Sequence, residues 1–186
     1  SELESAQFKF MQSELHAFRL QDVESAEVTA HGATRRLLHR DRKLPDQAQW
    51  VEEQAPQKRN ELYNNWFTRL GRLRARAYLP EGAEPGSDLP ASADGQSRQS
   101  RQSLDGAEAL RIEYKLADRP EAEAKLELVR VEDQGLPHYY ARTETTHAWV
   151  SLYDSSAKDL DQDVGMVVGV EQVPENRVHP PRPAGG

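Results

Sequence analysis

Hydrophobic and polar residues alternate along much of the second half of the chain, with the two-residue period of β-strands. Between Leu110 and Leu116 every second residue is apolar and the residues between them are charged, which is typical of a strand with one buried face. Residues 124–131 predict a further strand, and a turn containing Gly and Pro follows it. With residues 138–154, which read as two more strands, these segments predict an antiparallel meander.

Residues 138–154, HYYARTETTHAWVSLYD, predict a hairpin whose two faces differ. A turn at residues 144–145, or at 143–146 in the same register, places Tyr140 opposite Trp149, with Arg142 opposite His147 and His138 opposite Ser151. Because strand side chains alternate between faces, one face is then apolar and the other is aromatic, basic and hydroxylated. The candidate residues for binding a ligand or partner are Tyr140, Arg142, His147, Trp149 and Tyr153.

Two interpretations of this aromatic and basic face remain open. Aromatic rings beside a guanidinium group can bind a sugar, a peptide or a partner helix. Large aromatic side chains are usually buried, however. That tendency favours the simpler interpretation, in which a helix covers the face and no binding surface exists.

The first half of the chain predicts another hairpin, over residues 23–40. A four-residue loop, His31 to Thr34, would place Val28 opposite Leu37, whereas a two-residue loop would place Val28 opposite Arg35. We expect the longer loop, because the apolar face of a strand usually determines its register. A short strand at Trp50-Val51 is expected next.

A long amphipathic helix is predicted over Gln57–Tyr78, between Pro56 and Pro80. Its apolar residues recur at spacings of four, four, three and four: Leu62, Trp66, Leu70, Leu73 and Ala77. A second, shorter helix is expected after Ser155 or Ser156, with an Asp159 that completes a capping-box-like pair with Ser156.

Four arginines crowd the second half of the predicted long helix: Arg69, Arg72, Arg74 and Arg76. Such a cluster can bind phosphate or nucleic acid. It can also be a solvated face that complements the negative end of the helix dipole. The second interpretation is favoured, because the chain is acidic and no stacking aromatic residues interleave with the arginines.

The length of 186 residues fits one domain, or one domain with a long insert. Residues 1–174 are expected to form a single α+β domain, with a flexible insert at about 80–106, which includes the low-complexity SRQSRQS stretch, and a disordered tail at 175–186. The fold predicted is an antiparallel sheet of five to seven strands, built from hairpins and a meander. The long helix is expected to pack on one face, with the short C-terminal helix after the last strand.

Charge and residue types exclude several classes of function. The 186 residues carry a net charge of −7, which argues against a general nucleic-acid-binding surface. The absence of cysteine excludes disulfides and thiolate ligands for zinc or iron–sulfur clusters. No run approaches the roughly 20 apolar residues that span a membrane. The chain begins at Ser1, so an anchor or signal could precede it.

No combination of residues predicts catalysis, a metal site or a cofactor. Asp159, Asp161 and Asp163 have calcium-loop spacing, but the required Gly and Glu fall one residue late, at Gly165 and Glu171. The six histidines lack a recognised zinc spacing, and neither GxSxG nor GxGxxG occurs. We therefore expect no catalytic residues, no metal and no cofactor.

Four segments together resemble one bacterial family: FRLQDVESAEVTAHGATRRLLHRD, AQWVEEQAP, LYNNWFTRLGRLRAR and HYYARTETTHAWVSLYDSSAKDLDQDV. It is the domain-of-unknown-function family numbered four-three-four-zero, and the resemblance covers about residues 15 to 168. The SRQSRQS stretch and the lack of an N-terminal membrane helix depart from the family pattern.

This resemblance implies a location and partners. It implies a non-catalytic accessory domain on the periplasmic or extracytoplasmic face of a bacterial membrane, with a cytoplasmic location as the alternative. The expected partners are proteins of the envelope, in particular ABC transporters of the gliding-motility type, and contact with the membrane would come only through a possible N-terminal anchor. The alternative function is a small-ligand binding module that uses the aromatic and basic sheet face.

Overall fold

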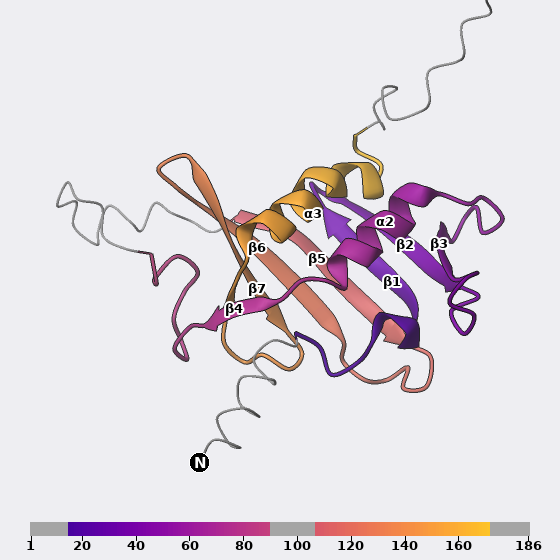
Figure 1. Cartoon of the computed structure of the whole chain (residues 1–186), viewed down its shortest axis with the longest axis horizontal. Coiled ribbons are helices and arrows are strands. Elements are labelled where there is room, and N and C mark those ends of the chain that lie inside the picture. The colour runs from indigo at the N-terminus through magenta and orange to yellow at the C-terminus, as the bar shows by residue number, and fades with distance from the viewer. Residues whose placement is uncertain (1–14, 90–106, 172–186) are drawn as a thin grey trace, which may run out of the picture.

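The computed structural model describes residues 15–89 and 107–171, and within these residues all strands belong to one antiparallel sheet (Figure 1). The architecture is α+β. The strands lie in the order β3-β2-β1-β5-β6-β7-β8-β4, which is one strand more than the largest number expected. Their bounds are β1 (Val23–Ala30), β2 (Ala33–Arg40), β3 (Gln49–Glu52), β4 (Ala75–Tyr78), β5 (Ala107–Leu116), β6 (Lys125–Asp133), β7 (Leu136–Thr143) and β8 (Val150–Leu152).

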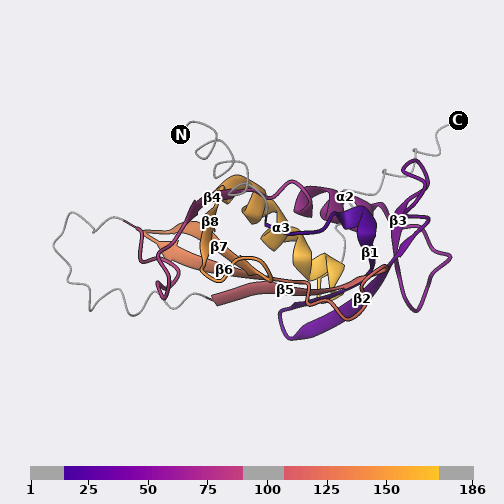
Figure 2. The same ribbon diagram turned by 90° about the horizontal axis from the view of Figure 1, so that it is seen from below.

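Two helices, α2 (Glu61–Leu70) and α3 (Asp154–Val167), lie side by side on one face of the sheet. A single 3-10 turn, η1 (Leu20–Asp22), precedes β1. Figure 2 shows the sheet edge-on, with β8 and β4 rising from its plane towards the helix layer. The strand that follows α2 in the chain is thus at the far edge of the sheet, beside the strand that leads into α3.

The register between β1 and β2 differs from the expected one. Val28 lies opposite Arg35, and the turn has two residues, His31 and Gly32, both with positive φ (51° and 76°). Two consecutive residues with positive φ make the tight turn whose twist matches that of paired strands. The preferred four-residue loop is therefore wrong: the geometry of the turn determined the register, and Arg35 lies on the same face as Val28.

The predicted long helix is wrong in its extent. Asn60 caps α2, since its side chain accepts a hydrogen bond from the N–H of Leu62 (3.0 Å), and the helix ends at Leu70 before Gly71. The residues that follow turn into β4. The C-terminal helix α3, expected to be the shorter of the two, is the longer at 14 residues against 10.

The main core lies between the sheet and the two helices. Trp66 of α2 is almost completely buried, and its indole N–H donates to the backbone C=O of Leu160 in α3 (3.1 Å). Phe67 stacks on Trp50 of β3, with ring centroids 3.8 Å apart. These contacts tie α2 to α3 and to the edge of the sheet. No helix in the parts of the chain that the structure describes is long and apolar enough to cross a bilayer.

Candidate functional site

The aromatic hairpin forms with a different register from the expected one. Tyr140 of β7 lies opposite Ser151 of β8, and Ala141 lies opposite Val150. The register is thus shifted by two residues from the predicted pairing of Tyr140 with Trp149, which is wrong. Because side-chain direction has a period of two, the shift leaves the residues of β7 and β8 on their predicted faces. His147 and Trp149 lie in the loop between the two strands, and Tyr153 follows β8. The hydroxyl of Thr146 accepts a hydrogen bond from the N–H of Thr143 (2.7 Å) within the longer loop that results.

Residues 80–89, assigned from the sequence to a flexible insert, instead pack on the sheet face opposite the helices. Leu79 and its neighbours cover a second buried cluster that contains Val129, Val131 and Tyr140. The Tyr140 side chain is 1% exposed, and its hydroxyl donates to Asp88 (2.6 Å). Burial and the Asp88 carboxylate both raise the pKa of Tyr140. Tyr140 is therefore a packing residue of this cluster rather than part of an open surface.

The other candidate residues of this face are not brought together as one site. Arg142 forms an ion pair with Glu127 (2.7 Å), and its guanidinium lies 4.6 Å from the ring centre of the partly buried Trp149. His147 and Tyr153 are exposed. Of the five candidates, Tyr140 is buried, Arg142 contacts Trp149 and Glu127, and His147 and Tyr153 face solvent. Residues 90–106 of the predicted insert and the predicted tail at 175–186 lie outside the described residues.

The buried carboxylates are held by partners within the fold. Asp161 accepts hydrogen bonds from the Tyr139 hydroxyl and from Arg130, both at 2.8 Å. Asp163 pairs with Arg69 of α2 (2.8 Å). These contacts attach α3 to the sheet and to α2, which is a structural role for two of the three aspartates that resembled a calcium loop. Among the residues described, no three potential metal-ligating side chains gather.

A third carboxylate, that of Glu144, connects the residues that precede η1 to the sheet. It accepts hydrogen bonds from His16 (3.1 Å) and from the N–H of Lys125 (3.1 Å). Burial opposes its ionisation, but the bonds from His16 and Lys125 lower its pKa overall. The adjacent Tyr114 hydroxyl is buried and has no hydrogen-bond partner among the described residues.

A polar cavity of about 440 Å³ opens where β3 ends beside β2. Arg35 reaches into the interior here and donates to Tyr63 (2.9 Å), to Glu52 (3.3 Å) and to the C=O of Val167 at the end of α3 (3.3 Å). The Tyr63 hydroxyl also donates to Glu52, and burial together with this bond raises the pKa of Tyr63 to about 12. The guanidinium thus neutralises Glu52 and complements the negative end of α3, so these charges serve the fold.

The two outer strands of the sheet differ in how their free edges are covered. At one edge, the N–H of Trp50 in β3 donates to the side chain of Asn64 in α2 (2.7 Å), which closes that position. At the other edge, the N–H of Leu79, just after β4, donates to the C=O of Trp149 (2.9 Å). Hydrogen-bonded and open pairs alternate in an antiparallel ladder, so the N–H and C=O of Tyr78 point away from β8. No hydrogen bond to these groups is made within the described parts of the chain.

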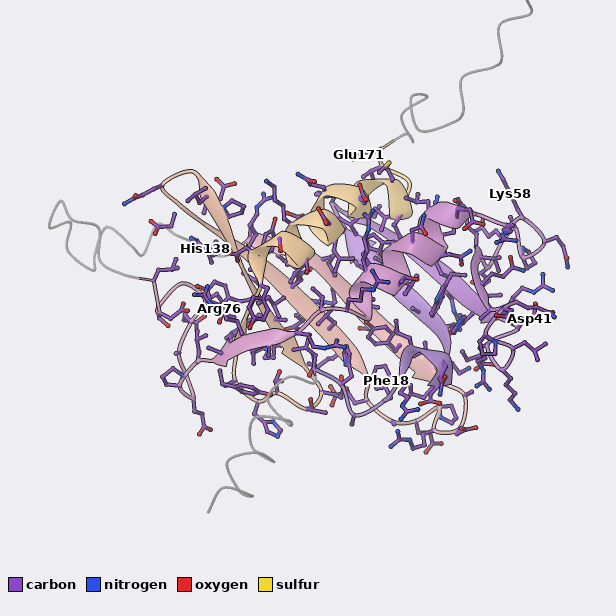
Figure 3. The ribbon with its side chains drawn as sticks, viewed as in Figure 1. Phe18, Asp41, Lys58, Arg76, His138 and Glu171 are labelled. Atoms are coloured by element: carbon purple, nitrogen blue, oxygen red, sulfur yellow. The ribbon has the colours of Figure 1, made fainter. Side chains whose placement is uncertain are left out.

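Exposed arginine and tyrosine side chains surround this open strand. Arg72, Arg74 and Arg76 are exposed, and no carboxylate in the described residues pairs with them. Tyr78 is 40% exposed and Tyr153 is 56% exposed. Figure 3 places Arg76 at the opposite end of the molecule from Lys58 and Asp41. We call this surface the β4 edge and define it by Arg72, Arg74, Arg76, Tyr78 and Tyr153.

The end of the segment predicted as a long helix also has the pattern of a strand. Gly71 follows the last residue of α2, and in residues 72–77 arginine alternates with Leu73, Ala75 and Ala77. A spacing of four from Leu73 to Ala77 is also a multiple of two, so it fits a helix and a strand equally. Of the four arginines only Arg69 lies in α2. Arg74 lies beyond the helix but still donates to the C=O of Gly71 at its C-terminal end (2.9 Å), whereas Arg72 and Arg76 make no such contact with the residues that the structure describes.

Comparisons with known proteins provide no relative: no family model, no curated protein and no solved structure matches this chain.

Proposed function

We propose that the chain is a non-catalytic domain that acts through protein–protein contacts, as an accessory of an envelope transport or motility system on the extracytoplasmic side of a bacterial membrane. The observation that carries the proposal is the β4 edge, a strand with an open backbone and exposed arginine and tyrosine side chains. Tyrosine and arginine are among the residues most enriched in protein interfaces.

The state of the interior carboxylates supports a binding role over a catalytic one. The interior carboxylates Asp161, Asp163 and Glu144 are each engaged by a cation, a hydroxyl or a backbone N–H of the same chain. Groups that are held in this way stabilise the fold and are poorly placed to accept a substrate proton. The envelope location and the transporter partners rest on the family resemblance alone.

The alternative of a small-ligand site on the aromatic face has weaker support. It would need the ring of Tyr140 and the guanidinium of Arg142 to meet a ligand, whereas Tyr140 is buried and Arg142 pairs with Glu127. We therefore place the contact surface at the β4 edge.

A photo-crosslinking experiment in cells tests this function. A photoreactive phenylalanine analogue replaces Tyr78 in the full-length protein, and the matched control carries it at Leu136, an exposed residue in the turn that joins β6 to β7. We expect an adduct with a membrane transport protein from position 78 and none from position 136. Equal adducts from both positions, or adducts from position 136 alone, would contradict a specific role for the β4 edge.

The location is tested separately by protease treatment of spheroplasts. An extracytoplasmic domain is digested while the inner membrane remains intact, and a cytoplasmic domain is digested only after lysis. Protection before lysis would refute the location, whatever the result of the crosslinking experiment.

A further inference from the structure

We infer that the β4 edge binds an extended, acidic segment of a partner protein, which adds to the sheet as a ninth strand beside β4. This inference rests on the proposed function, and it specifies the chemistry of the partner. Its basis is that an edge strand with unbonded backbone groups lies beside a local cluster of positive charge.

The backbone of β4 provides the template. The N–H and C=O of Tyr78 face away from β8 and make no hydrogen bond with the described residues. Main-chain hydrogen bonds along such an edge are the source of affinity when a peptide joins a sheet. At the opposite edge the corresponding N–H of Trp50 is already held by Asn64, so that edge offers less to an incoming strand.

The charge at the edge selects the partner. Arg72, Arg74 and Arg76 are exposed and form no ion pair among the described residues, although the chain as a whole carries a net charge of −7. Arg74 donates hydrogen bonds to the C=O groups of Gly71 and Leu73, whereas Arg72 and Arg76 make no such bond among the described residues. Carboxylates of an incoming strand would pair with these guanidinium groups. Acidic proteins in general would be repelled by the rest of the surface, so a local acidic segment presented by a partner fits best.

The same charges argue against a second copy of this chain as the partner. Antiparallel pairing of β4 (Ala75–Tyr78) with β4 of another copy about Arg76 would place the two Arg76 side chains opposite each other, and like charges across paired strands are destabilising. Arg76 also has no partner on β8, because Ala75 lies opposite Leu152 and Ala77 lies opposite Ser151. This bulge bends the edge for any strand that pairs with it, so it is the charge that distinguishes an acidic partner from a second copy.

The exposed tyrosines lie near both ends of the strand. Tyr78 is the last residue of β4, and Tyr153 directly follows Leu152, which lies opposite Ala75 at the start of β4. A strand placed along this edge would therefore lie next to Tyr78, whereas Tyr153 follows β8, one strand further into the sheet. The Tyr78 ring provides apolar contact area at small cost in side-chain entropy.

The test measures binding of a labelled peptide of alternating glutamate and valine by fluorescence anisotropy, with the full chain. The comparison peptide has lysine in place of glutamate. Two further versions carry N-methyl groups on alternate residues, one on the even and one on the odd positions. If the peptide forms a strand, only one set of its N–H groups faces β4, so one methylated version should lose binding and the other should retain it.

Charge-reversal variants test the site. Arg72→Glu with Arg76→Glu should weaken binding about tenfold or more. The matched control, Lys58→Glu with Arg119→Glu, changes the net charge equally at exposed positions outside the β4 edge and should leave binding within about twofold. A change in the hydrogen exchange of the Tyr78 amide on peptide addition provides an independent readout of the backbone contact.

The proposal is supported by binding of the acidic peptide alone, by its loss in the Arg72/Arg76 variant alone, and by sensitivity to one set of N-methyl groups. No binding, equal loss in both variants, or equal loss with both methylated peptides would overturn it. Concentration-dependent dimerisation in sedimentation that the Arg72/Arg76 variant abolishes would overturn it in favour of a second copy. If crosslinking from position 78 succeeds while the peptide fails to bind, the inference is wrong and the proposed function stands.

Discussion

Replacing Gly86 by alanine tests whether residues 79–89 are fixed on the sheet. Gly86 has φ of +92°, a conformation that L-residues rarely adopt, and a Cβ atom there would lie 3.2 Å from Cγ1 of Val131. The backbone strain should cost about 1–2 kcal/mol, and the close contact should add about 1 kcal/mol, because Val131 is 1% exposed and has little room to move. We therefore expect Gly86→Ala to lower the free energy of unfolding by about 2–3 kcal/mol.

Gly82→Ala is the matched control, because it introduces the backbone strain of an alanine at positive φ without a close side-chain contact. The φ of Gly82 is +79°, but nothing lies within 4 Å of a Cβ atom at this position. Gly82→Ala should therefore cost only the strain, about 1–2 kcal/mol. The double variant Gly86→Ala with Val131→Ala should cost less than the sum of the two single changes, since the shorter side chain at position 131 removes the clash.

Urea unfolding followed by tryptophan fluorescence measures these differences through the midpoint and the slope. A segment that moves freely has no fixed φ at either glycine and no contact with Val131. Changes below about 0.3 kcal/mol for both glycine variants would thus refute the packing of residues 79–89. Equal losses for both variants would retain a fixed segment but refute the close approach of Gly86 to Val131.

Three further predictions concern the helix layer and the dependence of stability on pH. Trp66→Phe removes the hydrogen bond to Leu160 and part of the buried ring. Chemical denaturation should therefore show a free energy of unfolding that is lower by about 2–3 kcal/mol. A decrease below about 0.5 kcal/mol would contradict the hydrogen-bonded contact between the helices. The pKa of Glu144 is lowered from 4.5 in the folded state, so its contribution is present above that value and is lost as the pH falls through the folded pKa. Urea midpoints measured from pH 6 downwards should consequently fall less steeply for Glu144→Gln than for the wild-type protein, and parallel profiles would disprove the role of the His16 contact. Burial lowers the pKa of His39 from 6.5, so protonation of this side chain favours the unfolded chain. The wild-type protein should therefore lose stability relative to His39→Phe as the pH falls below 6.5. A gain in the relative stability of the wild-type protein over this range would show that His39 is not buried in its neutral form.

The extent of α2 shows why a periodic pattern can mislead at its ends. Leu62, Trp66 and Leu70 follow the helical period and lie in α2, whereas Leu73 and Ala77 continue the same spacing in residues that turn and form β4. The local sequence permits either structure over residues 73–77. Pairing with β8 decides the outcome, because only the tertiary structure brings Val150 and Leu152 alongside.

The candidate site could be predicted only in part, for a related reason. The alternation of residues 138–142 assigns each side chain to a face, and this assignment survives the two-residue shift in register. It contains no information on what covers each face. Leu79 and Asp88, which cover Tyr140, are more than 50 residues away in the sequence, and nothing in the local pattern of either segment indicates that they meet.

The sequence by itself therefore determined the class of the fold, because the period of about 2 residues in strands and about 3.6 residues in helices is a local property of the pattern of apolar side chains. It also determined which side chains share a face of a strand. Only the tertiary structure decided which of those faces and edges are open. Long-range packing covers the aromatic face with residues 79–89 and closes the β3 edge with Asn64, while it leaves the backbone and the arginines of the β4 edge facing solvent. Exposure depends on contacts between segments that are distant in the chain, so the local sequence of one segment does not determine it.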